Sequence, residues 1–172
     1  MTSRRTVLRT SAAVTLGATA LISGADLAQA QSSTSPQRDR LEAQQCAEIE
    51  AVLKSYERAL DASDVAGVVR LYTDDAVVLA PGTPSAVGID AVRAAYTGIF
   101  QAIDIDLTFE TAEVKIVSPN WAFLRSTSHG VATILATGAQ IPSSNQELFV
   151  LQKVQGHWKL ARYSFSSVLP SA

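Results

Sequence analysis

Residues 144–168 read SNQELFVLQKVQGHWKLARYSFSSV, two runs of strand-forming residues on either side of Gln155-Gly156. Aliphatic and aromatic residues alternate in part with polar ones in each run, which is typical of a half-buried strand. A two-residue connection that contains glycine favours a tight β-hairpin turn. The segment therefore predicts an antiparallel hairpin of residues 144–154 and 158–168 at the end of the chain.

The residues before this hairpin also predict β structure. Ile105, Leu107 and Phe109 alternate with polar residues, and Val114 and Ile116 alternate in the opposite phase. A change of phase within one strand indicates a β-bulge, here near residues 110–113, which would bend the sheet. A further long strand is expected over residues 121–135 and a short one over residues 76–79.

The first half of the chain predicts three helices. Apolar residues recur every three or four positions over residues 41–61, a short helix capped by Asp64 follows over residues 65–72, and a third helix is expected over residues 89–102. Three helices packed on a strongly curved antiparallel sheet are an α+β fold. With the helices on its concave side, such a sheet forms a cone whose open mouth leads to an apolar pocket with a few polar side chains.

The first thirty residues resemble an export signal. Arg4 and Arg5 precede an apolar, charge-poor stretch, and Ala28-Gln29-Ala30 matches a cleavage site. The layout is similar to a twin-arginine signal, which implies passage through the twin-arginine translocase and a periplasmic or secreted location. The apolar run is shorter than the roughly 20 residues that span a bilayer. We expect cleavage after Ala30. After the expected cleavage site we predict a flexible linker over residues 31–40 and one domain over residues 41–172.

Composition excludes several function classes. The 172 residues carry 14 Lys plus Arg and 16 Asp plus Glu, a net charge of −2 that favours no nucleic-acid partner. Cys46 is the single cysteine, and no His/Cys spacing typical of a structural zinc site is present. No nicotinamide or flavin fingerprint is present either, so we expect no metal and no cofactor.

Two parts of the chain carry a family resemblance. Residues 56–61, YERALD, and 64–76, DVAGVVRLYTDDA, are similar to the opening of nuclear transport factor 2-like proteins, which include ketosteroid isomerases and SnoaL-like cyclases. Residues 145–153, NQELFVLQK, and 158–163, WKLARY, resemble the SgcJ/EcaC branch. The resemblance implies the cone-shaped fold and a homodimer. It implies no single activity, because the fold hosts isomerases, dehydratases, cyclases, hydrolases and non-enzymes.

The resemblance also implies roles for single residues. Tyr56 stands at the place of the isomerase tyrosine that donates a hydrogen bond to an enolate oxyanion. The isomerases carry their catalytic aspartate just before the proline after the first strand, and here that residue is Ala80, which cannot take a proton. Glu147 is the best replacement base and His129 is a second candidate. The alternatives are a core role for Tyr56, a surface role for His129 and a structural ion pair of Glu147 with Arg162.

Strand parity predicts which side chains share a face. A two-residue turn pairs Phe149 with Arg162 and Glu147 with Ser164. The pocket face then carries Asn145, Glu147, Phe149, Leu160, Arg162 and Ser164. The opposite face carries Leu148, Val150, Ala161, Tyr163 and Phe165, and is apolar enough for a dimer contact. The inverted assignment of the two faces is the open alternative. The substrate-binding candidates are Arg125, Thr127, Asn145, Phe149, Arg162 and Tyr96.

Two functions from different classes remain. The first is an enzyme of the isomerase, cyclase or dehydratase type that acts on a small apolar oxygenated molecule, with Tyr56 as oxyanion donor and Glu147 or His129 as base. The alternative is a non-catalytic binding module that uses Arg125 and Arg162 to hold an anionic apolar ligand. A purely structural dimer is a third and weaker hypothesis.

Overall fold

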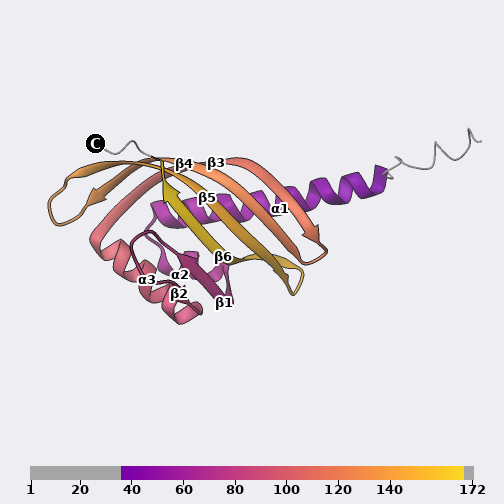
Figure 1. Ribbon diagram of the computed structural model, residues 1–172, viewed down its shortest axis with the longest axis horizontal. Coiled ribbons are helices and arrows are strands. Elements are labelled where there is room, and N and C mark those ends of the chain that lie inside the picture. Colours follow the sequence, from indigo (N-terminus) through magenta and orange to yellow (C-terminus); the bar gives the residue numbers. More distant parts are fainter. Residues whose placement is uncertain (1–35, 169–172) are drawn as a thin grey trace, which may run out of the picture. The chain divides into compact units, whose positions relative to one another are not determined.

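The described part of the chain is built on a curled six-stranded sheet in the order β2-β1-β6-β5-β4-β3 (Figure 1). The computed structural model describes residues 36–168; the expected signal peptide lies outside them. The strands are β1 (Tyr72–Leu79), β2 (Ala86–Val87), β3 (Ile103–Ser118), β4 (Trp121–Ile134), β5 (Gln140–Val154) and β6 (His157–Ser167). The helices are α1 (Pro36–Asp61), α2 (Val65–Arg70) and α3 (Ile89–Ala102). The α+β fold predicted from the sequence is confirmed.

One pair of strands departs from the expected antiparallel sheet. β1 and β6 are parallel, whereas all other neighbouring strands are antiparallel. The reason is topological. After β1 the chain crosses through α3 to the far edge of the sheet and returns through the β3-β4-β5-β6 meander, so that β6 arrives beside β1 in the same direction.

The helices begin and end close to the predicted residues, with two differences. α1 begins at Pro36, so residues 36–40, which we assigned to a flexible linker, are helical. Proline is favoured in the first turn, and the arginine, glutamine, leucine and glutamate that follow are good helix formers. α2 ends at Arg70 rather than Tyr72, because Tyr72 already begins β1. Within residues 36–168 no helix is long and apolar enough to span a membrane.

The C-terminal hairpin has the predicted turn but not the predicted register. Gln155 and Gly156 both have positive φ, 50° and 83°, as a two-residue turn that follows strand twist requires. Leu151 pairs with Leu160 as expected. The register then shifts by one residue, so that Phe149 pairs with Tyr163 and not with Arg162. The extra residue, Ala161, reverses the parity of β6 beyond it.

This shift corrects the predicted faces of β6. Tyr163 and Phe165 lie on the concave side, where both line a cavity, and Arg162 points to the convex side. The expected convex dimer face therefore lacks these two aromatic rings. The bulge predicted in β3 is confirmed, because the β3–β4 register shifts between Thr111 and Glu113.

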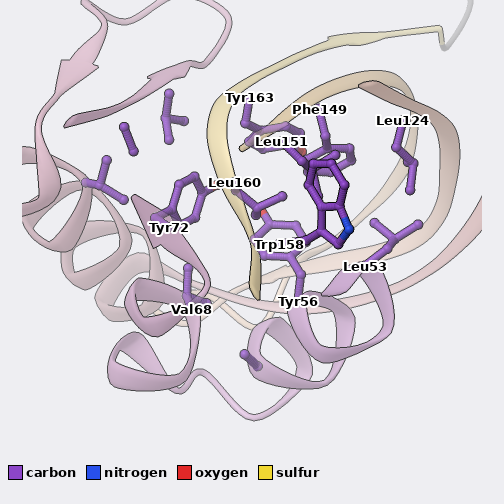
Figure 2. Close-up of a cluster of buried hydrophobic side chains, with 14 of the residues drawn as sticks. Leu53, Tyr56, Val68, Tyr72, Leu124, Phe149, Leu151, Trp158, Leu160 and Tyr163 are labelled. Carbon is purple, nitrogen blue, oxygen red and sulfur yellow. The ribbon is translucent and has the colours of Figure 1, made fainter. Parts of the chain in front are cut away.

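Aromatic rings fill the space between α1 and the sheet. Figure 2 shows Leu53 and Tyr56 projecting from α1 toward side chains of the sheet, among them Trp158 and Phe149. The Tyr56 ring meets the rings of Phe149 and Tyr163 edge to face, each at 5.7 Å between centroids. Packed in this way, Tyr56 also lines the cavity on the concave side of the sheet.

Candidate functional site

A cavity of about 670 Å³ lies between α3 and the concave face of the sheet. Its wall is mainly apolar and comes from β1, α3, β3 and β6, including Val78, Ile99, Ile103, Ile105, Leu107 and Phe165. Its polar side chains include Tyr56, Tyr96, Ser143, Asn145, Glu147 and Tyr163. Within residues 36–168, no lysine, arginine or histidine lines it. The volume and lining suit a small, mostly apolar molecule.

Glu147 is the acidic group of this cavity. Only 5% of the Glu147 residue is exposed to solvent. The Ser126 hydroxyl donates to Oε2 at 2.5 Å and the Ser128 hydroxyl donates to Oε1 at 2.7 Å. Burial raises the pKa of the Glu147 carboxyl above its ordinary value, and the two hydroxyl donors oppose that rise. A carboxyl with a raised pKa is well placed to exchange protons near neutral pH.

The expected ion pair between Glu147 and Arg162 is wrong. Arg162 lies beyond the Ala161 bulge on the convex side, where its guanidinium donates to the Asp75 carboxylate at 3.4 Å. Within residues 36–168, Glu147 forms no ion pair with any basic side chain. Glu147 is therefore a buried acid whose polar partners are hydroxyl groups.

Three tyrosine hydroxyls form a chain beside the cavity. The Tyr96 hydroxyl is 2.7 Å from that of Tyr56 and 2.9 Å from that of Tyr72. Burial raises the pKa of Tyr96 to about 12 and raises the pKa values of Tyr56 and Tyr72 well above their ordinary range, so all three are neutral donors at physiological pH. If Tyr72 donates to Tyr96 and Tyr96 to Tyr56, the Tyr56 proton is left for another acceptor, either the neighbouring Tyr163 hydroxyl or a ligand oxygen in the cavity.

Other predicted site residues on β4 lie outside the cavity. Arg125, Thr127 and His129 are exposed on the convex side, and the Arg125 Nε donates to Glu113 at 2.8 Å. Ser126 and Ser128 alternate with them and point to the concave side. The expectation that Arg125, Thr127 and His129 line the cavity is therefore wrong.

The remaining candidates lie at or beneath the cavity. Tyr56, Tyr96, Asn145 and Glu147 converge there as predicted. Phe149 is buried below it, stacked on Tyr163 at 4.3 Å between ring centroids. Phe149 was predicted to contact substrate, but it contacts the Tyr163 ring, which itself lines the cavity. Ala80 also lines the cavity, at the place where the resemblance puts an aspartate.

Sequence reasoning missed Ser126, Ser128, Tyr72 and Tyr163 as parts of the site. The sequence left open which face of β4 is buried. The large apolar residues Trp121 and Phe123 lie on one face, and Leu124 lies on the face that carries the two serines. Leu124 is the buried member, at 1% exposure. Tyr163 was placed on the opposite face because the bulge at Ala161 leaves no mark in the sequence.

Comparisons with known proteins identify the family and support the fold. Residues 52–160 match the family model described as a SnoaL-like domain. A ketosteroid isomerase-like protein from Erwinia carotovora atroseptica SCRI1043 is 41% identical, with a TM-score of 0.69 over 72% of this chain and 96% of that one. A conserved protein from Planctomyces limnophilus DSM 3776 is 26% identical, with a TM-score of 0.63 over 70% of this chain and 95% of that one.

A more distant structure shares the fold alone. It is a protein from Novosphingobium aromaticivorans DSM 12444 provisionally named a scytalone dehydratase, 20% identical with a TM-score of 0.67 over 74% of this chain and 87% of that one. A comparison with curated protein sequences finds no match. The narrower resemblance to the SgcJ/EcaC branch stays a prediction.

Proposed function

Since the chain belongs to the SnoaL-like domain family, we propose that it is a cofactor-independent enzyme of the isomerase, cyclase or dehydratase type. Its substrate is a small, mostly apolar molecule with a carbonyl or hydroxyl oxygen. The observation that carries the proposal is the meeting of Glu147 with neutral tyrosine hydroxyls in a cavity whose other walls are apolar. A proton acceptor and an oxyanion donor in one apolar site are the two groups that enolisation needs.

The proposed chemistry begins with proton transfer to Glu147. The carboxylate takes a proton from the carbon beside the substrate carbonyl, and the electron pair of that C–H bond forms the enolate double bond. The carbonyl oxygen becomes an oxyanion that accepts a hydrogen bond from Tyr56. Glu147 then returns the proton to another carbon in an isomerisation, or to a departing hydroxyl, which leaves as water, in a dehydration.

A non-catalytic binding module is the second candidate. Ala80 favours it, because the position that the resemblance assigns to a catalytic aspartate lines the cavity without a proton acceptor. The anionic ligand that we expected for such a module is not supported, because Arg125 and Arg162 point away from the cavity. A binding module with this cavity would take a neutral apolar ligand.

Two small molecules test enolisation and binding in separate assays. 2-Tetralone, an enolisable apolar ketone, is followed by exchange of its α-hydrogens in deuterium oxide, and binding of 2-naphthol is followed by its fluorescence. We expect Glu147→Gln to slow exchange by about 10²- to 10⁴-fold, the usual contribution of a general base, while 2-naphthol still binds. Glu110→Gln, which makes the same change on an exposed residue of β3, is the matched control.

The outcomes decide between the two functions. Exchange that is as fast in Glu147→Gln as in the unaltered protein would contradict the role of Glu147 as base. Binding of 2-naphthol without any catalysed exchange would favour the binding module. Native mass spectrometry of protein purified from the exported fraction tests further for a bound small molecule that defines the natural ligand class.

Export is a separate part of the proposal. The twin-arginine layout around Arg4 and Arg5 supports a periplasmic or secreted location. Replacing both residues, Arg4→Lys and Arg5→Lys, keeps the positive charge and removes the arginine pair. We expect the precursor to stay in the cytoplasmic fraction, and equal export of the variant would contradict a twin-arginine route.

A further inference from the structure

The partners of Glu147 form a set built from two neighbouring strands. In the β4–β5 register Ser126 stands opposite Glu147 and Ser128 stands opposite Asn145. Ser126, Ser128, Asn145 and Glu147 are all buried. Buried polar side chains are costly unless each finds a hydrogen-bond partner, so four of them in contact indicate a network rather than chance.

Both oxygens of the Glu147 carboxyl are within reach of a serine hydroxyl. Hydroxyl donors lie about 2.5–2.7 Å from ionised carboxylates, closer than most neutral pairs. The Ser126 and Ser128 hydroxyl oxygens lie at 2.5 and 2.7 Å from the two carboxyl oxygens. Each oxygen thus receives one short bond from a hydroxyl, an arrangement that suits a carboxylate.

Asn145 gives the network a direction. Its Nδ2 donates to the Ser128 hydroxyl oxygen at 3.2 Å and to the Ser143 hydroxyl oxygen at 3.2 Å. An amide nitrogen only donates, so Ser128 is an acceptor toward Asn145. The proton of Ser128 is then left to point at Glu147, whose Oε1 is the acceptor in reach.

No cation assists these hydroxyls. Within residues 36–168, Glu147 has no ion-pair partner, and the titratable groups that face it across the mainly apolar cavity are the Tyr96 and Tyr163 hydroxyls. Burial of an uncompensated carboxylate favours its neutral form. The hydroxyl bonds are therefore what opposes protonation of Glu147 at this place in the fold.

We infer that Ser126 and Ser128 are positioning residues that hold Glu147 as a carboxylate directed into the cavity, and that Asn145 orients Ser128 for this role. The inference rests on the proposed function in one respect, the use of that carboxylate to accept a proton from substrate. Substrate touches Glu147, whereas the serines act through it. The serines thus determine the pH above which the site is active.

The test is a titration of Glu147 in ligand-free protein. Infrared spectra of protein labelled with carbon-13 at its glutamate carboxyls are recorded against pH, and Glu147→Gln identifies the band that belongs to Glu147. We expect Ser126→Ala and Ser128→Ala each to raise the pKa of Glu147 by about one pH unit or more, since a hydrogen bond to a charged group contributes about 1.5–3 kcal/mol and one pKa unit is about 1.4 kcal/mol.

Two kinds of variant make the titration specific. Ser126→Thr and Ser128→Thr keep a hydroxyl on the same strand and should leave the pKa close to that of the unaltered protein. Thr127→Val removes a hydroxyl from between the two serines, but on the convex side, and should leave the pKa unchanged. If an alanine variant fails to fold, Ser→Cys at the same position, a near-isostere with a weak donor, should show the same rise.

The inference is overturned if the pKa of Glu147 is the same in the serine variants as in the unaltered protein, or if Glu147 is already protonated at neutral pH in the latter. Because the titration needs neither ligand nor turnover, a protein that shows the expected shifts but no exchange of 2-tetralone would refute the proposed enzyme alone. In an active protein, the rising limb of exchange rate against pH should move to higher pH in Ser126→Ala and Ser128→Ala.

Discussion

The hydroxyl of Tyr96 should be the most valuable single polar atom of the buried tyrosine chain. It bonds to two other hydroxyls, those of Tyr56 at 2.7 Å and Tyr72 at 2.9 Å, and all three residues are buried. Tyr96→Phe removes one oxygen and keeps the ring, so packing changes little. It removes one hydrogen bond from each of the other two hydroxyls.

The magnitude follows from the number of bonds lost. A hydrogen bond within a protein contributes about 0.5–1.5 kcal/mol net, so two bonds predict a loss of about 1–3 kcal/mol in the free energy of unfolding for Tyr96→Phe. Tyr72→Phe removes one of the same bonds and should cost about half as much. The ratio of the two losses is predicted more precisely than either loss, because both variants remove the same kind of hydroxyl from buried tyrosines.

Urea denaturation followed by circular dichroism measures both losses. The slope of unfolding free energy against urea should be the same in the three proteins, so that the difference in midpoint reports stability alone. Equal losses for Tyr96→Phe and Tyr72→Phe, or a loss below about 0.5 kcal/mol for Tyr96→Phe, would refute a chain centred on Tyr96.

Three further predictions test the charge, the sheet and the assembly. Glu147→Gln should raise the free energy of unfolding at neutral pH, because burial raises the pKa of the folded carboxyl above its unfolded value of 4.5 and so disfavours its charged form. The gain is full above the folded pKa and should shrink as pH falls toward 4.5, which urea titrations at several pH values will show; a gain that grows on acidification would contradict it. Gly130→Ala should cost about 1–3 kcal/mol, because overpacking forces backbone to move and the new Cβ would lie 2.0 Å from the Asp106 carbonyl oxygen. Thermal unfolding checks this loss. An unchanged melting temperature would show that β3 and β4 can move apart at this position without cost. Leu148→Glu together with Phe123→Glu, on the convex face, should convert the expected homodimer to a monomer in light scattering, and a mass unchanged from a dimer would refute a contact on this face.

Local sequence patterns were enough for the elements and for part of the site. The Gln155-Gly156 turn, the bulge near Thr111 and the span of α3 all follow from short-range rules of turn chemistry and periodicity. Tyr56 could be proposed because the family resemblance places an oxyanion-donating tyrosine there, and Glu147 because an acid on a buried strand face needs a partner or a chemical role. The turn, the bulge and the helix each depend on residues within a few positions of one another.

The partners of those residues could not be predicted in the same way. One extra residue, Ala161, shifts the register against β5 and so reverses the parity of β6 beyond it. That reversal places Tyr163 in the cavity and Arg162 outside it. The alternation of residues along one strand does not show where such an extra residue lies, because a bulge is defined only by the pairing with the neighbouring strand.

The sequence by itself thus determined an α+β chain with a bent sheet, a resemblance to a versatile fold and one unusual acid. Tertiary structure alone decided that Glu147 meets two serines instead of an arginine. It also decided that three tyrosines far apart in the chain are linked by hydrogen bonds between their hydroxyl groups. The physical reason is range. Turns and helices arise from neighbouring residues, whereas the charge and partners of a buried group depend on whatever distant strands bring within hydrogen-bond distance.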